Sequence, residues 1–215
     1  MVFDFDGLLV DTEWSIYEMA RDSFAAFGVV LDVATWATVV GRSNADECAG
    51  LCAAQGWDID QAAWWRHYDS LDRSHRDHLP VQPGVVDLLD ACAALDVPVG
   101  IASSSGRSWI EGHLDRLGLS TRFTTIAGVD RTGGVGKPAP DVYLLACADL
   151  GADPAGSVAL EDSAPGLAAA RAAGMATVAV PTRITAHTDL TGADLTVSSL
   201  ADLDLATLAA LVAAP

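Results

Sequence analysis

The sequence is poor in basic residues and contains a single lysine. Lysine and arginine together number 12 against 29 acidic residues, so the 215-residue chain carries a formal net charge of −17. Nucleic acid is therefore not an expected partner, because phosphate backbones bind basic surfaces. A small anionic substrate would need local positive groups or a metal ion to overcome the negative field of the whole protein.

Long hydrophobic runs and targeting signals are also missing. No apolar stretch reaches the roughly 18 residues that a membrane span requires, and the first residues lack the basic and apolar regions of a secretory signal. Hydrophobic residues still make up 51% of the chain, which predicts a globular core. We expect a cytoplasmic protein that contacts no membrane.

Cysteine is scarce and lacks the spacing of a metal site. Cys48 and Cys52 lie four residues apart, and no CxxC pair or partnered histidine accompanies them. A structural zinc site is thus not expected. Since Cys92 and Cys147 fall in alanine-rich helical segments, the simplest interpretation is four free thiols in a reducing compartment.

The first dozen residues are the most informative stretch. Val2 and Phe3 favour a short buried strand, which ends before Gly7. Asp4 and Asp6 stand at its carboxyl end, where open α/β sheets bind ligands. Two adjacent carboxylates repel each other, so either both are solvated or a cation or catalytic task holds them together. Because the strand begins at once, either the chain starts within it or further residues precede it.

Residues 13–79 are predicted to be helical, with no strand. Five of the six tryptophans fall in this segment. Aromatic rings can stack on a sugar, but a small helical unit also needs them for its own core, which is the interpretation we favour. We predict a helical domain at residues 13–79, inserted into a catalytic core formed by residues 1–12 and 80–215. Its helices are expected at residues 14–27, after residue 32, at residues 44–52 and at residues 60–78.

From residue 80 onward, predicted helices and strands alternate. Strands are expected at residues 97–102, 123–129, 157–160, 176–180 and 194–197. Helices are expected at residues 85–95, 107–117, 142–150, 163–173 and 201–212. Such alternation is typical of βαβ units. We therefore predict an α/β fold, with a Rossmann-like three-layer core around a parallel sheet and a small α-helical domain inserted after the first strand.

Polar residues follow four of these segments and would meet at one edge of the sheet. Asp4, Asp6 and Asp162 offer hard oxygen ligands that suit Mg²⁺. Ser103, at the start of a predicted helix, suits a phosphate oxygen, and Lys137 supplies positive charge. A carboxylate nucleophile, a metal ion, a lysine and an anion site together predict phosphoryl transfer.

Lys137 is a further indication of phosphoryl transfer, because it is the only lysine in the chain. A compact ammonium group can neutralise a phosphate and an attacking carboxylate together, which a bulkier guanidinium does less easily. A chance surface lysine is the alternative. Its place in Gly-Lys-Pro-Ala-Pro-Asp at residues 136–141, beside a predicted carboxylate cluster, disfavours that alternative.

Four segments resemble the motifs of the haloacid dehalogenase superfamily. They are Asp-Phe-Asp-Gly-Leu-Leu-Val-Asp-Thr-Glu at residues 4–13, Ala-Ser-Ser-Ser at 102–105, Gly-Lys-Pro-Ala-Pro-Asp at 136–141 and Leu-Glu-Asp-Ser-Ala-Pro-Gly at 160–166. The serine motif alone is weakly specific, but the four in this order are highly specific and cover essentially the whole chain. The helical segment is similar to the small mobile cap of the subgroup that contains phosphoglycolate phosphatase and β-phosphoglucomutase.

The resemblance implies a role for each acidic residue. Asp4 would attack phosphorus and become an aspartyl-phosphate, and Asp6 would protonate the leaving oxygen and then activate water. Mg²⁺ would lie between the Asp4 carboxylate, the backbone carbonyl of Asp6 and Asp162. Glu161 would bind or orient that metal shell.

Substrate binding is expected to involve both parts of the chain. By resemblance, Ser103, Ser104 and Lys137 would hold the transferring phosphoryl group. Arg42 and Arg66 are candidate contacts from the cap to the rest of the substrate, although a solvated surface arginine is the alternative at both positions. The expected partner is a small phosphorylated metabolite such as a sugar phosphate, and the expected state is a monomer, because no large unexplained apolar stripe is visible.

Phosphatase activity is the favoured hypothesis among several. Asp6 argues against a dehalogenase, and a helical segment without lysine argues against a phosphonatase. A sugar phosphomutase of the β-phosphoglucomutase type is the closer competitor; such enzymes use a histidine where this chain has Ile16 and a cap lysine, which Arg66 could replace. A non-catalytic binding protein is the third hypothesis, and the intact catalytic motifs disfavour it.

Overall fold

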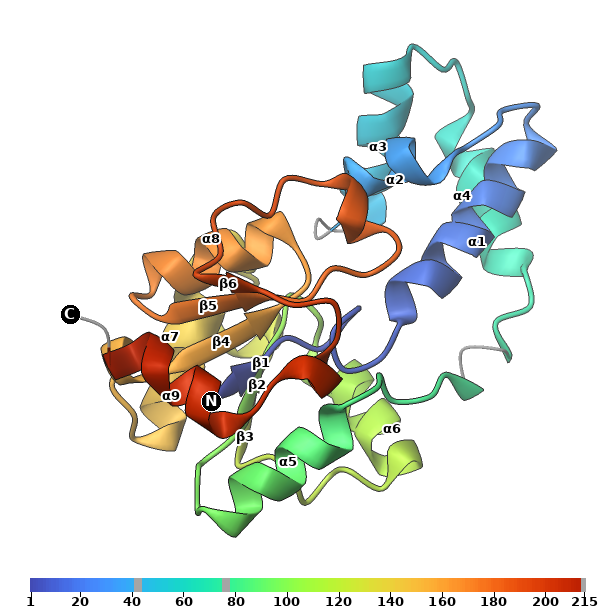
Figure 1. Cartoon of the computed structure of the whole chain (residues 1–215). Coiled ribbons are helices and arrows are strands. Elements are labelled where there is room, and N and C mark those ends of the chain that lie inside the picture. The colour runs from blue at the N-terminus through green and yellow to red at the C-terminus, as the bar shows by residue number, and fades with distance from the viewer. Residues whose placement is uncertain (41–43, 75–77, 214–215) are drawn as a thin grey trace.

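The protein has a parallel β-sheet at its centre (Figure 1). The computed structural model describes residues 1–40, 44–74 and 78–213. Six strands form the sheet in the order β3-β2-β1-β4-β5-β6, and every neighbouring pair is parallel. The strands are β1 (Val2–Phe3), β2 (Gly100–Ala102), β3 (Thr125–Ala127), β4 (Val158–Glu161), β5 (Ala176–Ala179) and β6 (Leu195–Thr196). The predicted α/β fold is therefore confirmed.

Helices cover both faces of the sheet because successive strand residues point to opposite sides. Phe3 and Leu160 pack in one cluster with side chains of α5 (Val85–Ala94), α6 (Arg107–Leu117) and α9 (Leu205–Ala213). Val2 and Ala159, their neighbours in sequence, pack in another cluster against α7 (Asp141–Leu150) and α8 (Ala164–Ala172). Short 3₁₀ helices η2 (Val129–Arg131), η3 (Pro154–Gly156), η4 (Thr185–His187) and η5 (Leu200–Asp202) complete the core.

Four helices follow β1 and lie beside the core, at the upper right of Figure 1. They are α1 (Thr12–Ala26), α2 (Val33–Ala37), α3 (Asn44–Gln55) and α4 (Gln61–Ser70). Trp36 and Trp64 are almost fully buried in a hydrophobic cluster that these helices share, and Trp14, Trp57 and Trp65 pack around it. The tryptophans therefore form this cluster, as the sequence predicts. We name residues 13–79 the helical insertion.

Two backbone segments connect the helical insertion to the sheet, and they lie side by side. Val10 on the outgoing segment pairs with Val81 on the returning one in an antiparallel bridge. Gln82 donates its backbone N–H to Leu9 O at 2.9 Å and its side-chain amide to Gly7 O at 3.0 Å. The two linkers therefore join the insertion immediately beside Asp4 and Asp6.

Some predicted helices are shorter in the structure. The helix predicted at residues 60–78 begins after its N-cap Asp60 but ends at Ser70, because Leu71 adopts an extended conformation and packs against the core of the insertion. The helix predicted at residues 201–212 begins at Leu205, after η5. Within the described ranges, no helix has the length and apolarity to cross a membrane.

Candidate active site

Three acidic side chains meet at the carboxyl ends of β1 and β4. Asp4 follows β1 and donates its backbone N–H to Leu160 O at 2.9 Å, which fixes it beside Glu161 and Asp162. One carboxylate oxygen from each of Asp4, Glu161 and Asp162 lies within 4.8 Å of the others. All three residues are buried, with at most 5% of their surface exposed. We name these three residues the carboxylate cluster.

The Lys137 ammonium lies inside this cluster. Its Nζ donates to Asp4 Oδ1 and, at 2.5 Å, to Glu161 Oε1, and only 5% of its side chain is exposed. Burial alone would lower the pKa of Lys137, but the Asp4 and Glu161 carboxylates outweigh that effect and raise it. The lysine is therefore a fixed positive charge, and it reaches Asp4 from the loop that precedes α7.

One lysine does not neutralise three carboxylates. Burial, followed by repulsion from Glu161 and Asp6, raises the pKa of Asp4 to about 8 although Lys137 opposes the shift. Burial and repulsion from Asp4 and Glu161 likewise raise the pKa of Asp162 well above its usual value. The ionised cluster is thus short of positive charge, which a bound cation would supply.

The geometry around Asp162 fits a metal ion. Its Oδ2 atom is buried and has no hydrogen-bond partner among the residues that the structure describes. Gly7 adopts a left-handed φ of +92°, and a Cβ atom there would lie 2.2 Å from this oxygen. A side chain at position 7 would therefore fill the space in front of Oδ2. Buried carboxylate oxygens with such space suit a hard divalent cation such as Mg²⁺.

Glu161 is bound differently from its two neighbours, because both of its oxygens are fully engaged. Oε1 accepts from Lys137 and from the Tyr143 hydroxyl, both at 2.5 Å. Oε2 accepts from the backbone N–H groups of Asp162 and Ser163 and from the Ser163 hydroxyl, at 3.1 to 3.3 Å. Because both oxygens already have partners, Glu161 is better suited to anchoring Lys137 than to binding a metal ion.

The Asp6 carboxylate lies beside the cluster and accepts four hydrogen bonds. Thr12 and the Trp109 indole donate to Oδ1 at 2.8 and 3.0 Å. Ser103 and Ser105 donate to Oδ2 at 3.3 and 2.6 Å. Each oxygen therefore has its own pair of donors, which fixes the plane of the carboxylate.

Residues 103–106 form a loop between β2 and α6 that we name the serine loop. Ser103 is buried, and its hydroxyl oxygen accepts from Ser105 N at 2.9 Å. Ser104 accepts from the backbone N–H of Lys137 at 3.1 Å, so the serine loop and the lysine loop hold each other. Ser103, Ser105 and Lys137 are thus brought to the same edge of the sheet as Asp4, as the sequence predicts for Ser103 and Lys137.

Several residues of the site have no role predicted from the sequence. Thr12 and Ser105 lie within the quoted motifs, and their place in those motifs could have identified them as residues of the site. Trp109 and Tyr143 lie on α6 and α7, where their aromatic character indicates only a place in the core. Their polar contacts with Asp6 and Glu161 depend on the tertiary fold.

The structure describes only one of the two arginines proposed to contact substrate. Arg42 lies outside the described residues. Arg66 is exposed on α4, and among the described residues it makes no hydrogen bond or ion pair with the carboxylate cluster. A role for either arginine stays a prediction.

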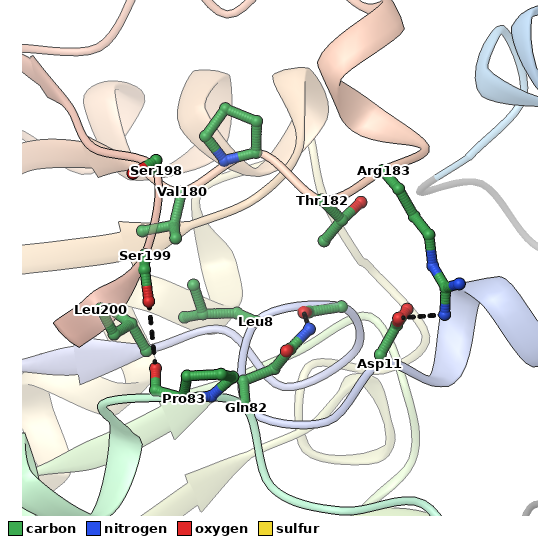
Figure 2. Close-up of a pocket in the computed structure, with 12 residues that line it drawn as sticks. Leu8, Asp11, Gln82, Pro83, Val180, Thr182, Arg183, Ser198, Ser199 and Leu200 are labelled. Atoms are coloured by element: carbon green, nitrogen blue, oxygen red, sulfur yellow. Dashed lines mark hydrogen bonds and ion pairs between the residues drawn. The ribbon is translucent and has the colours of Figure 1, made fainter. Parts of the chain in front are cut away.

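A pocket of about 360 Å³ adjoins the linkers and is lined in part by Gly7 and Gln82 (Figure 2). Asp11 and Arg183 also line it and form an ion pair at 2.9 Å. Arg183 lies over the Trp14 ring as well, with its guanidinium carbon 3.8 Å from the ring centroid. Arg183 thus joins the loop after β5 to the start of α1.

The chain is similar to known proteins over nearly its whole length. A model of haloacid dehalogenase-like hydrolases matches residues 1–180. The protein YhcW of Bacillus subtilis (strain 168) is 35% identical over 215 residues, which cover 97% of this chain and 94% of that protein. A phosphoglycolate phosphatase of Chromobacterium violaceum is 32% identical over 209 residues, covering 94% and 93% of the two chains.

Solved structures show the same fold. The β-phosphoglucomutase from Clostridium difficile superposes with a TM-score of 0.79 at 22% identity, covering 98% of this chain and 95% of that one. A variant of CbbY from Rhodobacter sphaeroides, solved in complex with xylulose-(1,5)bisphosphate, superposes with a TM-score of 0.77 at 26% identity. That match covers 96% of this chain and 97% of the other.

Proposed function

The chain belongs to the haloacid dehalogenase-like hydrolases, and on that premise we propose that it is a Mg²⁺-dependent phosphatase of small phosphate monoesters. The observation that carries this proposal is the position of Lys137, whose ammonium joins Asp4 to Glu161 inside a buried carboxylate cluster. A nucleophilic carboxylate and a fixed cation side by side suit attack on a phosphate group. Sugar phosphates and similar metabolites are the proposed substrates.

In the first step, a carboxylate oxygen of Asp4 forms a bond to phosphorus, and the bond from phosphorus to the ester oxygen breaks. Asp6 gives its proton to the departing alkoxide, which leaves as the alcohol. Lys137 and Ser103 hold the phosphoryl oxygens while the phosphoryl group moves from the ester oxygen to Asp4. The product is an aspartyl-phosphate at Asp4.

In the second step, the ionised Asp6 takes a proton from water, and the water oxygen attacks phosphorus. The bond between phosphorus and the Asp4 oxygen breaks, which restores the Asp4 carboxylate and releases inorganic phosphate. Asp6 is protonated again for the next turnover. One carboxylate therefore serves as acid and then as base.

Asp4, Asp162 and the backbone carbonyl of Asp6 would hold Mg²⁺, which when bound neutralises charge on the phosphoryl oxygens. The buried Oδ2 atom of Asp162, which lacks a hydrogen-bond partner within the described part of the chain, supports this assignment. Glu161 would orient the site through Lys137 and the backbone around Asp162, because its own oxygens already accept five hydrogen bonds.

We further propose that the helical insertion acts as a cap on a core formed by residues 1–12 and 80–215. Its two linkers are paired at Val10 and Val81, which would serve as a narrow hinge. Ile184, from the loop after β5, packs within the cluster of the insertion, and this contact would have to open when the cap moves. Arg42 and Arg66 remain candidates for contacting the rest of the substrate. The four buried free thiols favour a cytoplasmic protein, and a monomer is the proposed state.

A sugar phosphomutase is the second candidate, because the fold is shared with a β-phosphoglucomutase. A mutase of that type uses a histidine where this chain has Ile16, which is buried among the residues of the insertion. The insertion also contains no lysine. Both differences favour transfer of the phosphoryl group to water over its return to a sugar.

Hydrolysis of an aryl phosphate with Mg²⁺ tests the proposal. The parent should release phosphate, and Asp4→Asn should lose several orders of magnitude in kcat. Equal rates in the two proteins would contradict the assignment of Asp4. A panel of sugar phosphates, sugar bisphosphates and phosphoglycolate then separates the candidates, since a mutase would isomerise a sugar phosphate in the presence of its bisphosphate and release little free phosphate.

A further inference from the structure

Helix α6 carries a row of three polar side chains that leads away from the site. Trp109, His113 and Arg116 are spaced four and three residues apart, so they lie along one face of the helix. The row begins at Asp6 and ends at Leu79, on the segment that returns from the helical insertion. Nothing in the roles assigned above uses these three residues.

The first contact in the row is direct. The Trp109 indole Nε1 donates to Asp6 Oδ1 at 3.0 Å. The indole ring packs edge-on against the His113 ring, with centroids 4.4 Å apart and an interplanar angle of 73°. His113 in turn packs against Phe5, which separates Asp4 from Asp6 in the sequence, at 5.8 Å between centroids. The indole is thus held between the acid and a buried ring.

Arg116 connects the row to the returning linker. Its Nη2 lies 3.2 Å from His113 Nδ1 and donates to Leu79 O at 2.7 Å. A guanidinium has no acceptor atom, so His113 Nδ1 must accept in this pair. Leu79 stands two residues before Val81, the residue that pairs with the outgoing linker at Val10.

From these contacts we infer that Trp109 is a positioning residue for Asp6. His113 and Arg116 hold the Trp109 indole in place relative to the linker that returns from the helical insertion. The inference rests on the proposed role of Asp6. An indole N–H can only donate, so Trp109 keeps Oδ1 as an acceptor. Ser103 and Ser105 donate to Oδ2 through hydroxyl groups, which can also accept, so a proton carried on Oδ2 would keep hydrogen-bond partners, whereas one on Oδ1 would face the indole N–H.

Nuclear magnetic resonance tests the contact without any turnover. The ¹⁵N-labelled full chain gives one indole signal for each of six tryptophans, and the Trp109 signal is assigned by its loss in Trp109→Phe or, if that variant does not fold, through the backbone. The Trp109 signal should move more than the other five in Asp6→Asn. A Trp109 signal that stays in place in Asp6→Asn would overturn the inference.

Kinetics test the positioning role. With an aryl phosphate and Mg²⁺, Trp109→Phe keeps an aromatic ring but removes the N–H, so kcat should fall about fivefold or more while KM stays within about twofold. Trp57→Phe on the helical insertion is the matched control and should change neither constant. A parental kcat in Trp109→Phe, or the same loss in both variants, contradicts the role.

The role of Arg116 is tested by combining variants. Arg116→Gln removes the donor to Leu79 and His113 from an exposed position, and it should lower kcat by a smaller factor than Trp109→Phe. If the row acts as a unit, the double variant should lose less than the product of the two single losses. If the fold losses in kcat of the two single variants multiply fully in the double variant, Arg116 does not act through Trp109.

A parent that hydrolyses no phosphate ester would refute the proposed function, and the indole signals would still decide whether Trp109 contacts Asp6.

Discussion

A Cβ atom on Gly166 would lie 1.9 Å from Oε1 of Glu161. Gly166 is in the first turn of α8, so the helix backbone presses directly against the carboxylate that holds Lys137. Glu161 cannot move away without breaking its bonds to Lys137 and Tyr143. The position of the only lysine therefore depends on a residue without a side chain at position 166.

Replacing Gly166 with alanine should damage both stability and activity. Gly166→Ala should lower the free energy of unfolding by about 1–3 kcal/mol through overpacking, and it should reduce kcat because Lys137 loses its anchor. Gly112→Ala is the matched control, since Gly112 is also helical and, among the described residues, an added Cβ there would meet no heavy atom within 4 Å apart from its own helix backbone and chain neighbours. That control should be unchanged or more stable by up to about 1 kcal/mol. Equal urea midpoints for both variants would contradict the packing argument.

Mg²⁺ should stabilise the folded protein through Asp162. At about one hundred times its dissociation constant, a ligand that binds only the native state adds about 2.7 kcal/mol, so Tm should rise when Mg²⁺ replaces a chelator. Asp162→Asn should abolish that rise, and without metal it should be at least as stable as the parent because one of three repelling carboxylates is gone. Asp58→Asn, an exposed control on the insertion, should keep the full response. A full response in Asp162→Asn would exclude Asp162 as a ligand.

Arg183 should contribute modestly to stability. It pairs with Asp11 and stacks on Trp14, and both partners lie where α1 begins. Because more than half of its side chain is exposed, we expect Arg183→Ala to cost about 1 kcal/mol in urea unfolding, and Arg183→Lys to fall between that variant and the parent. If Arg183→Lys were as destabilised as Arg183→Ala, the charge would contribute nothing and only the planar stacking would matter.

The four thiols should react slowly in the native state. Cys48, Cys52, Cys92 and Cys147 are all buried, and burial raises the pKa of Cys48 to about 12. Thiolate is the reactive form, so at pH 8 a thiol-specific chromogenic reagent should modify the protein at a rate limited by opening of the fold. In urea all four should react at once. Rapid reaction of any cysteine in the native protein would contradict its burial.

The sequence predicts the residues at the sheet edge because strand ends and motifs are local features. Asp4, Ser103, Lys137 and Asp162 each follow a recognisable strand or loop signal, and parallel strands bring such ends together. The donors around Asp6 are different, since Trp109 reaches it from a helix about one hundred residues later in the sequence. No local pattern separates such an indole from one that only fills the core.

The ends of helices are also poorly predicted by local sequence patterns. Residues 71–78 have the polar composition of a helix surface, yet α4 stops at Ser70 because Leu71 packs back against the insertion. That packing is a tertiary interaction, which outweighs a weak local preference. The alternation of strands and helices from residue 80 onward predicts the sheet correctly, because each element there buries one apolar face against the next.

The most direct test of the central claim is to trap phosphate on Asp4. Mixing the enzyme with Mg²⁺ and a ³²P-labelled phosphate ester, then quenching in acid within milliseconds, should leave a protein-bound label that hydroxylamine removes, as expected for an acyl phosphate. The parent should show the label, Asp6→Asn should acquire it more slowly because it lacks the acid of the first step, and Asp4→Asn should show none. An equally labelled Asp4→Asn, or an active parent that never carries label, would contradict the account.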